Sequence, residues 1–353
     1  MKLRTFSQLL LFAFVIMCVA PSCVKEGPMG PAGKDGVDGT NGTDGADGSV
    51  TCLACHSGTN MAQKKAEFAM SEHSVGAIAV DYAGGRAECA QCHSHEGFVQ
   101  YATFGTVAGA ITNPSAWECA TCHGIHSTFE GTDYALRLKA PVVAASNKNV
   151  TLDAKGNSNL CVNCHQSRTA EPNVATPGAA TFKISNAHYG PHHGPQANVV
   201  LGVGFAEIPG SVAYPTAGSS KHVTMMDQTK GACVGCHMAP FANKQGGHSY
   251  IPSLAACNSC HGGDPATTYN YGGVQSDVQK KLEELRDKLV ELGVVAYSEA
   301  DAAYEPVVGT YPMIQAQAFY NWIGLEEDRS LGVHNPKYVN ALLINTLEAL
   351  NKQ

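Results

Sequence analysis

The sequence lacks an excess of basic residues. Its 353 residues hold 23 Lys and Arg against 30 Asp and Glu, which gives a formal net charge of −7 at pH 7. A surface that attracts nucleic acid needs the opposite balance. We therefore expect no nucleic-acid partner and favour basic or metal-bearing partners.

The sequence also lacks an apolar run long enough to count with confidence as a membrane span. The run Leu9–Ala20 follows two basic residues and falls short of the roughly 20 residues that a spanning helix needs. It predicts a secretory signal of the lipoprotein type over residues 1–22. Cys23 follows Ala-Pro-Ser, which resembles a loose lipobox, so we expect Cys23 to be lipidated. Cleavage near Ala20 with an unmodified Cys23 is the alternative.

Glycine occupies every third position from Gly27 to Val50, for eight triplets. This is the collagen-like Gly-X-Y pattern. So few triplets favour an extended spacer. Residues 23–50 then hold the lipidated cysteine and this spacer, whose 24 triplet residues span about 75 Å at full polyproline-II extension. Trimerisation through a collagen-like helix is the minority interpretation.

Cysteine is plentiful, and its spacing is regular. Twelve of the 14 cysteines form six C-x-x-C pairs, and a histidine follows each pair at once. We number these C-x-x-C-H motifs 1 to 6 in chain order: Cys52, Cys55 and His56; Cys89, Cys92 and His93; Cys119, Cys122 and His123; Cys161, Cys164 and His165; Cys233, Cys236 and His237; Cys257, Cys260 and His261.

A histidine at that one position distinguishes between the uses of paired cysteines. Zinc sites and redox dithiols do not require it, whereas c-type haem attachment does. The two thiols bond to the vinyl groups of one haem, and the adjacent imidazole binds the iron as proximal ligand. We therefore predict six haem c groups, with zinc clusters or a disulfide scaffold as the remaining alternatives.

Residues 51–353 are predicted to form the haem domain. We expect a mainly α fold with little β structure, whose irregular loops wrap around a chain of six haems. Residues 275–353 contain no cysteine and form its helical C-terminal part. Apolar spacing predicts helices over 276–293, with Ser276 as cap, over 313–325, and from Asn335-Pro336 onward. A further helical face is expected from Asn60 to His73.

Distal iron ligands must come from the nine histidines outside the motifs. Metal–imidazole bonds of about 2 Å place the Cα atoms of two ligands roughly 12 Å apart, and three extended residues reach only about 10 Å. His126 therefore cannot share an iron with His123, and His95 cannot share one with His93. Either can serve only a neighbouring haem.

The haem domain resembles bacterial multihaem c-type cytochromes. CATCHGIH, PHHGPQANVVLG, CVGCHMAP with GGHSY, and GVHNP carry the resemblance, and the last two are similar to the cytochrome c nitrite reductase and hydroxylamine oxidoreductase superfamily. The resemblance implies distal roles for His126, His192, His248 and His334, and for His73 and His222 upstream of motifs. His95, His188 and His193 remain unassigned.

Two departures from that superfamily matter. The sequence contains no C-x-x-C-K, the motif that marks the catalytic haem of the nitrite reductases. No tyrosine is marked for the crosslink that the hydroxylamine oxidoreductases use. We therefore predict an electron carrier without catalytic residues.

The predicted carrier works at the outer membrane, at the cell surface or outside the cell. It is either tethered to the membrane by its lipid or a subunit of a filament in which haems stack end to end between copies. Its expected partners are other multihaem cytochromes or extracellular electron acceptors. The alternative function is a reductase of a small nitrogen or sulfur oxyanion with one open haem.

Overall fold

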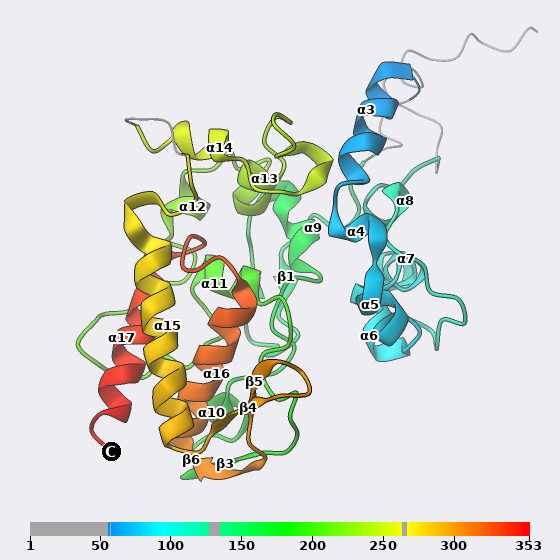
Figure 1. Ribbon diagram of the computed structural model, residues 1–353. Coiled ribbons are helices and arrows are strands. Elements are labelled where there is room, and N and C mark those ends of the chain that lie inside the picture. The colour runs from blue at the N-terminus through cyan, green and yellow to red at the C-terminus, as the bar shows by residue number, and fades with distance from the viewer. Residues whose placement is uncertain (1–55, 57, 127–134, 263–266) are drawn as a thin grey trace, which may run out of the picture. The chain divides into compact units, whose positions relative to one another are not determined.

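The computed structural model describes residue 56 and residues 58–126, 135–262 and 267–353 (Figure 1). The predicted signal, Cys23, the glycine triplets, Cys52 and Cys55 lie outside these residues. The described part is mainly helical and contains only short strands, as predicted. None of its helices combines the length and the apolar character needed to cross a membrane.

The first group of helices surrounds motifs 2 and 3. It consists of α3 (Gly58–Phe68), α4 (Glu72–Val75), α5 (Ala77–Ala79), η1 (Val80–Gly84), α6 (Ala87–His93), α7 (His95–Phe104) and α8 (Cys119–Cys122). The predicted helical face from Asn60 to His73 is wrong at its end, because α3 stops at Phe68. His73 lies instead on α4, which Ser71 caps by accepting a bond from the backbone N of Ser74.

The middle of the chain consists of short elements joined by loops. They are β1 (Val142–Val143), β2 (Thr151–Leu152), η2 (Gly156–Ser158), α9 (Asn159–Val162), α10 (Pro172–Ala175), β3 (Thr181–Ile184), α11 (Gln196–Leu201), α12 (Lys221–Thr224), α13 (Gly231–His237), η3 (Gly247–Ser249), α14 (Leu254–Asn258) and η4 (Tyr271–Gly273). Motifs 2 to 6 each begin on a short helix. A helical turn brings residues i and i+3 to one face, so both cysteines of a motif can reach one planar group.

The C-terminal part packs three longer helices side by side (Figure 1). They are α15 (Val274–Glu291), α16 (Met313–Asp328) and α17 (Pro336–Leu350). The apolar spacing that predicted a helix over 276–293 is confirmed on α15, because Val278, Leu282, Leu285 and Leu289 are buried. Each fully buried leucine contributes roughly 1.5–3 kcal/mol to stability.

The predicted starts of these helices had different outcomes. Asn335 caps α17 as expected, accepting a bond from the backbone N of Tyr338 with Pro336 at the first helical position. The cap expected at Ser276 is wrong. The side chain of Asn270 instead accepts bonds from the backbone N of Gln275 (2.9 Å) and of Ser276 (3.2 Å), and α15 begins at Val274.

Three two-stranded antiparallel sheets complete the described structure. Two of them lie beside the C-terminal helices and involve β4 (Val295–Ser298), β5 (Ala303–Pro306) and β6 (Gly309–Pro312). β4 pairs with β5, and β6 pairs with β3, with Thr181 opposite Pro312. The β3–β6 pairing ties the middle of the chain to the start of α16.

Candidate functional site

Each motif histidine faces one of the six histidines predicted as distal ligands. The centres of the two rings lie 5.9–6.4 Å apart in every pair. The pairs are His56 with His126, His93 with His192, His123 with His248, His165 with His73, His237 with His334, and His261 with His222.

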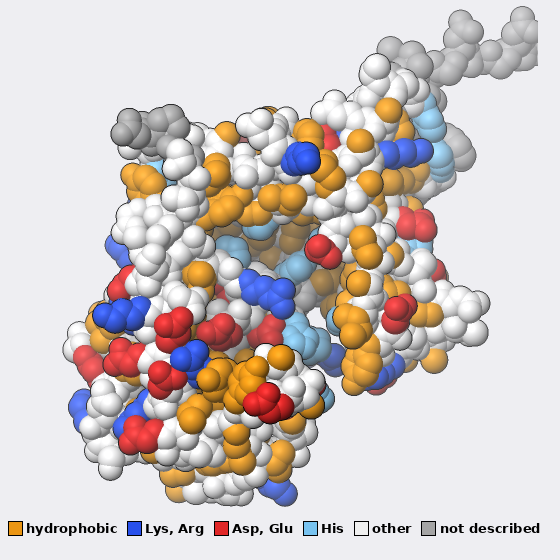
Figure 2. All heavy atoms as spheres, viewed as in Figure 1, with side chains coloured by type: hydrophobic (Ala, Val, Ile, Leu, Met, Phe, Trp, Pro, Cys, Tyr) orange, Lys and Arg blue, Asp and Glu red, His pale blue; other side chains and the backbone are white. Residues whose placement is uncertain are grey.

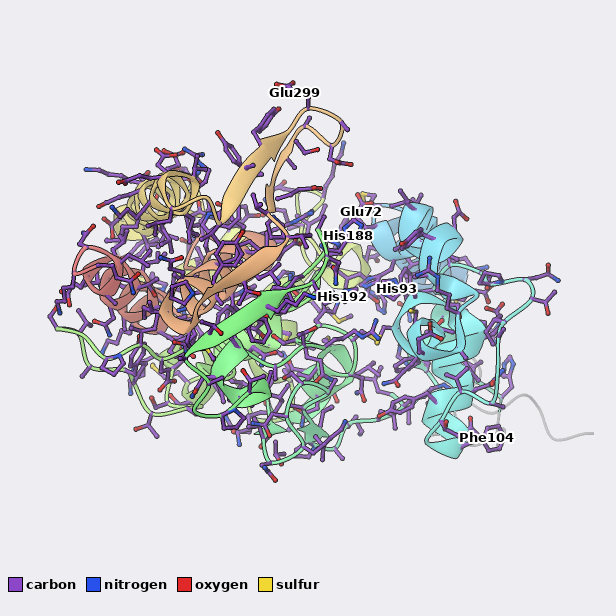
Figure 3. The ribbon with its side chains drawn as sticks, turned by 90° about the horizontal axis from the view of Figure 1, so that it is seen from below. Glu72, His93, Phe104, His188, His192 and Glu299 are labelled. Carbon is purple, nitrogen blue, oxygen red and sulfur yellow. The ribbon has the colours of Figure 1, made fainter. Side chains whose placement is uncertain are left out.

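This separation fits a metal between the two rings. Metal–imidazole bonds of about 2 Å, plus about 1 Å from each coordinating nitrogen to its ring centre, place two ligating rings about 6 Å apart. Nε2 of His192 is buried without a hydrogen-bond partner in the described structure. The ring of His192 lies 5.9 Å from that of His93, and Figure 3 shows these two side chains close together.

Two of the paired rings, His73 and His192, have the protonation state that a ligand needs. Burial lowers the pKa of His73 to about 4, with a smaller contribution from His165. Burial also lowers the pKa of His192 to about 4, assisted by the nearby Arg168. Both rings are therefore neutral at pH 7, and a neutral imidazole has the lone pair that binds a metal.

One continuous cavity of about 1860 Å³ runs past motifs 2 to 6. It exceeds the roughly 300–1,000 Å³ of an ordinary small-molecule site. Cysteines from all five motifs and ten of the twelve paired histidines line it; the exceptions are His56 and His126. Figure 2 shows the hollow with histidine side chains in its walls. The cavity therefore joins five of the six ring pairs into one large site.

The described motif cysteines form no disulfide with one another. Burial raises the pKa of Cys122 to about 11, with the neighbouring Cys119 adding to the effect. Burial likewise raises the pKa of Cys236 to about 11. No group of three or more His, Cys, Asp or Glu side chains converges on a metal position within residues 58–126, 135–262 and 267–353.

Motif 4 touches motifs 2 and 5. On the side of motif 2, Sγ of Cys92 donates a hydrogen bond of 3.7 Å to the carbonyl of Asn163, the residue before Cys164. On the side of motif 5, Ser158 just before motif 4 accepts bonds of 3.0 Å from the backbone N of Cys233 and Val234.

Other contacts join the remaining motifs. Motif 5 meets motif 6 through Ser253, whose backbone N donates to the carbonyl of Cys236 (3.1 Å) and whose carbonyl accepts a bond from Sγ of Cys257 (3.8 Å). Motif 1 meets motif 3, because His126 follows His123 closely and faces His56. Nδ1 of His95, two residues after His93 of motif 2, lies 2.7 Å from Oγ1 of Thr121 within motif 3. These contacts connect all six motifs, and motif 2 touches both motif 3 and motif 4.

Tyr250 connects the surroundings of motifs 3, 4 and 5. Its ring centre lies 5.0 Å from that of His73 and 6.2 Å from that of His248. Its carbonyl accepts a hydrogen bond of 2.8 Å from Nδ1 of His237. Sequence reasoning did not single out Tyr250, although it ends the GGHSY segment that identified His248.

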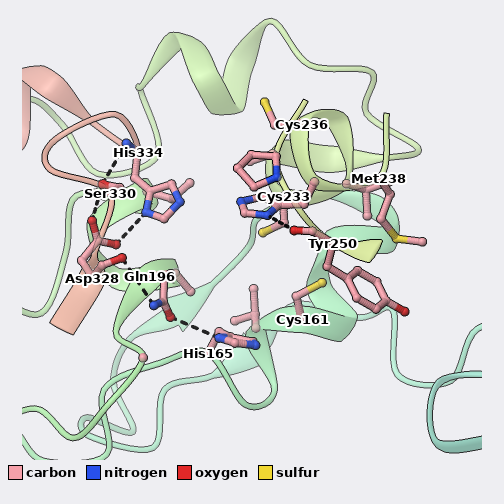
Figure 4. A pocket seen from close by; sticks show the side chains of 18 of the residues that line it. Cys161, His165, Gln196, Cys233, Cys236, Met238, Tyr250, Asp328, Ser330 and His334 are labelled. Carbon is pink, nitrogen blue, oxygen red and sulfur yellow. Dashed lines mark hydrogen bonds and ion pairs between the residues drawn. The ribbon is translucent and has the colours of Figure 1, made fainter. Parts of the chain in front are cut away.

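The outer nitrogens of several paired rings have polar partners (Figure 4). Nδ1 of His165 lies 3.2 Å from Oε1 of Gln196. Nδ1 of His334 lies 2.6 Å from Oδ1 of Asp328. Such partners fix the tautomer and orientation of a ligating histidine and leave Nε2 free for a metal. Neither partner was predicted, because no local pattern links it to its histidine.

The three histidines without an assigned role are not part of the six ring pairs. Nδ1 of His95 lies 2.7 Å from Oγ1 of Thr121. His193 forms an ion pair of 2.8 Å with Glu327, and its side chain is 78% exposed. The backbone N of His188 donates to Oδ1 of Asn186.

No protein-family model matches the chain, and no curated protein matches its sequence. Among solved structures, the chain is similar to "Crystal Structure of Outer Cell Wall Cytochrome OcwA", with 19% sequence identity and a TM-score of 0.52. The similarity covers 81% of this chain and 50% of that one, so this chain spans about half the length of its structural neighbour. The described fold is thus similar to that of a cytochrome. The predicted similarity to the nitrite reductase superfamily stays a prediction.

Proposed function

We propose that this protein is an extracellular electron carrier that binds six haem c groups. The observation that carries the proposal is the set of six histidine pairs, each with one motif histidine and each at a ring separation that fits an iron. The cysteines of motifs 1 to 6 would attach the haems covalently. The motif histidines would be the proximal ligands, and His73, His126, His192, His222, His248 and His334 the distal ones.

Haem, when bound, supplies reversible one-electron chemistry at iron. The residues of this chain would hold the groups at fixed spacing and keep water away from them. Every motif histidine has a facing ring, so the ligand set is complete without an open position. This favours a carrier over the alternative reductase of a nitrogen or sulfur oxyanion.

The contacts between motifs support a route for electrons along the series 1, 3, 4, 5 and 6. Electrons tunnel efficiently only when neighbouring cofactors lie close together. Shared contacts, such as the bond from the backbone N of Cys233 to Ser158 just before motif 4, bring neighbouring motifs together. Motif 2 touches motif 3 through His95 and motif 4 through Cys92, so it would offer a second path between them.

The proposed location is the outside of the cell. A lipid on Cys23 and the glycine-triplet spacer would tether the haem domain at the outer membrane, where it could meet other multihaem cytochromes or extracellular acceptors. The name of the structural neighbour places that protein in an outer cell wall. The described chain supplies a facing ring for every motif histidine, so a ligand donated by another copy is not needed. A tethered carrier is therefore preferred to a filament subunit.

Two measurements on mature protein purified from the producing cells test the proposal. Intact-mass measurement should give the polypeptide plus six haem masses. Electron paramagnetic resonance of the oxidised protein should show only low-spin ferric haem. A lower mass on fully matured protein would contradict the haem count. A stoichiometric high-spin signal would contradict the closed ligand set and favour the reductase.

A further inference from the structure

Asp328 ends helix α16 and contacts the ring of His334. Its Oδ1 lies 2.6 Å from Nδ1 of His334. Its Oδ2 accepts a hydrogen bond from the hydroxyl of Ser330, which also accepts one of 3.3 Å from the backbone N of His334. The three residues form a closed turn between α16 and α17 (Figure 4). This turn holds the carboxylate and the imidazole in one arrangement.

The carboxylate of Asp328 is buried, and its ion-pair partner among the described residues is His334 itself. The Asp328 side chain is 1% exposed, and it forms no ion pair with a lysine or arginine in the described ranges. Glu67 provides a contrast beside His248. Its side chain is equally buried, but its Oε2 lies 3.5 Å from Nδ1 of His248, and Lys64 pairs with it at 3.1 Å. Asp328 therefore lies closer to Nδ1 of its histidine than Glu67 does. No lysine or arginine among the described residues offsets its charge, whereas Lys64 offsets that of Glu67.

A carboxylate that accepts the Nδ1 proton makes the opposite nitrogen of an imidazole a stronger base. Interactions of this kind tune the metal that the ring binds. A more basic ring stabilises ferric iron, which carries one more positive charge, more than ferrous iron. The low-dielectric surroundings strengthen this effect.

Gln196 is the outer partner of the proximal ring at motif 4, whereas Asp328 is the outer partner of the distal ring at motif 5. Oε1 of Gln196 lies 3.2 Å from Nδ1 of His165, and its amide nitrogen lies 3.5 Å from the backbone carbonyl of Asp328. Motif 5 thus has a ligand ring with a charged outer partner, Asp328, and motif 4 has a ligand ring with a neutral one, Gln196. The neutral amide polarises its imidazole less than a carboxylate does.

We propose that Asp328 is a positioning residue that lowers the reduction potential of the motif 5 haem below that of the motif 4 haem. This inference rests on the proposed function, because it requires His334 as the distal ligand of motif 5. The pair Asp328 and Gln196 would create a step in potential between two neighbouring haems. Electrons would then rest preferentially on the motif 4 side of this step.

The test is a potentiometric titration of mature six-haem protein, followed by electron paramagnetic resonance. The variant His334→Ala first identifies the motif 5 signal, because that haem should become high-spin. In Asp328→Asn, the midpoint potential of this haem should rise while the other five stay unchanged. Asp328→Glu should restore a value near that of the wild type. Gln196→Glu should have the opposite effect and lower the potential of the motif 4 haem.

The outcomes separate the inference from the proposed function. If His334→Ala opens a haem but Asp328→Asn shifts no potential, the role of Asp328 is wrong and the six-haem carrier stands. If His334→Ala opens no haem, the ligand set itself is wrong. If Asp328→Asn fails to mature, Ser330→Ala replaces it. That variant removes the donor to Oδ2, leaves more charge on Oδ1 and should lower the potential; an unchanged potential would overturn the inference.

Discussion

The imidazole rings of His56 and His126 lie 6.0 Å apart and nearly parallel, with 7° between their planes. One ring belongs to motif 1, and the other closely follows motif 3. The pair therefore fastens the beginning of the haem domain to a segment far along the chain. It also agrees with the geometric expectation that His126 cannot serve the haem of its own motif.

This pairing predicts different effects for two histidines that each closely follow a motif. His126→Ala should leave the motif 1 haem without a distal ligand and turn one of six haems high-spin. His95→Ala is the matched control, because His95 contacts Thr121 rather than a motif histidine. It should leave all six haems low-spin. Electron paramagnetic resonance of the oxidised variants measures this, and a high-spin haem in the His95 variant would contradict the pairing.

Replacing His334 should open a different haem. His334 faces His237 at 6.3 Å between ring centres, so His334→Ala should convert the motif 5 haem to the high-spin state and leave five unchanged. Carbon monoxide should then bind one iron per molecule in the reduced protein. Optical titration with carbon monoxide gives this number. Binding of carbon monoxide to wild type at the same stoichiometry would show that an open haem exists without the mutation.

Much of the site could be predicted from the sequence because its signals are local. The C-x-x-C-H motifs are five-residue patterns, and all twelve proposed ligands could be named from them and from short flanking segments. The pairing of those ligands could not be predicted. His222 faces His261 and His73 faces His165, and such contacts depend on how distant loops fold against one another.

The same division between local and distant signals applies to the fold. The Asn335-Pro336 start of α17 is a local capping pattern, and it was predicted correctly. The start of α15 was not, because the capping side chain of Asn270 lies before a 3₁₀ turn and reaches forward to Gln275. Asp328 gave no signal, since an aspartate six positions before a histidine contacts it only when the chain turns between α16 and α17.

The proposed tether predicts a change in location when Cys23 is replaced. Cys23→Ala removes the thiol that would carry the lipid, so the haem domain should appear in the medium in soluble form. Haem content should stay at six, because Cys23 belongs to no C-x-x-C-H motif. Fractionation of cells with haem staining measures the distribution. Wild-type protein without a lipid, or a variant that stays with the membrane, would contradict the tether.

Motif 4 lies on both paths to motif 3, one past Tyr250 and one through motif 2, so two neighbouring pairs should differ in their importance for electron flow. His73 faces the histidine of motif 4, which touches motifs 2 and 5, whereas His192 faces that of motif 2. A photosensitiser attached at Thr267→Cys, an exposed position near motif 6, would inject electrons at that end. The variant His126→Ala would report their arrival at motif 1 through its high-spin absorption.

In the His126→Ala background, His73→Ala should strongly slow the arrival of electrons at motif 1. Electrons on the way from motif 5 to motif 3 must pass motif 4. His192→Ala should leave the rate near that of the background, because the path from motif 4 to motif 3 past Tyr250 stays intact. Each variant loses one distal histidine, so the two are matched in what they remove. Equal slowing by both would show that electrons reach motif 3 only through motif 2.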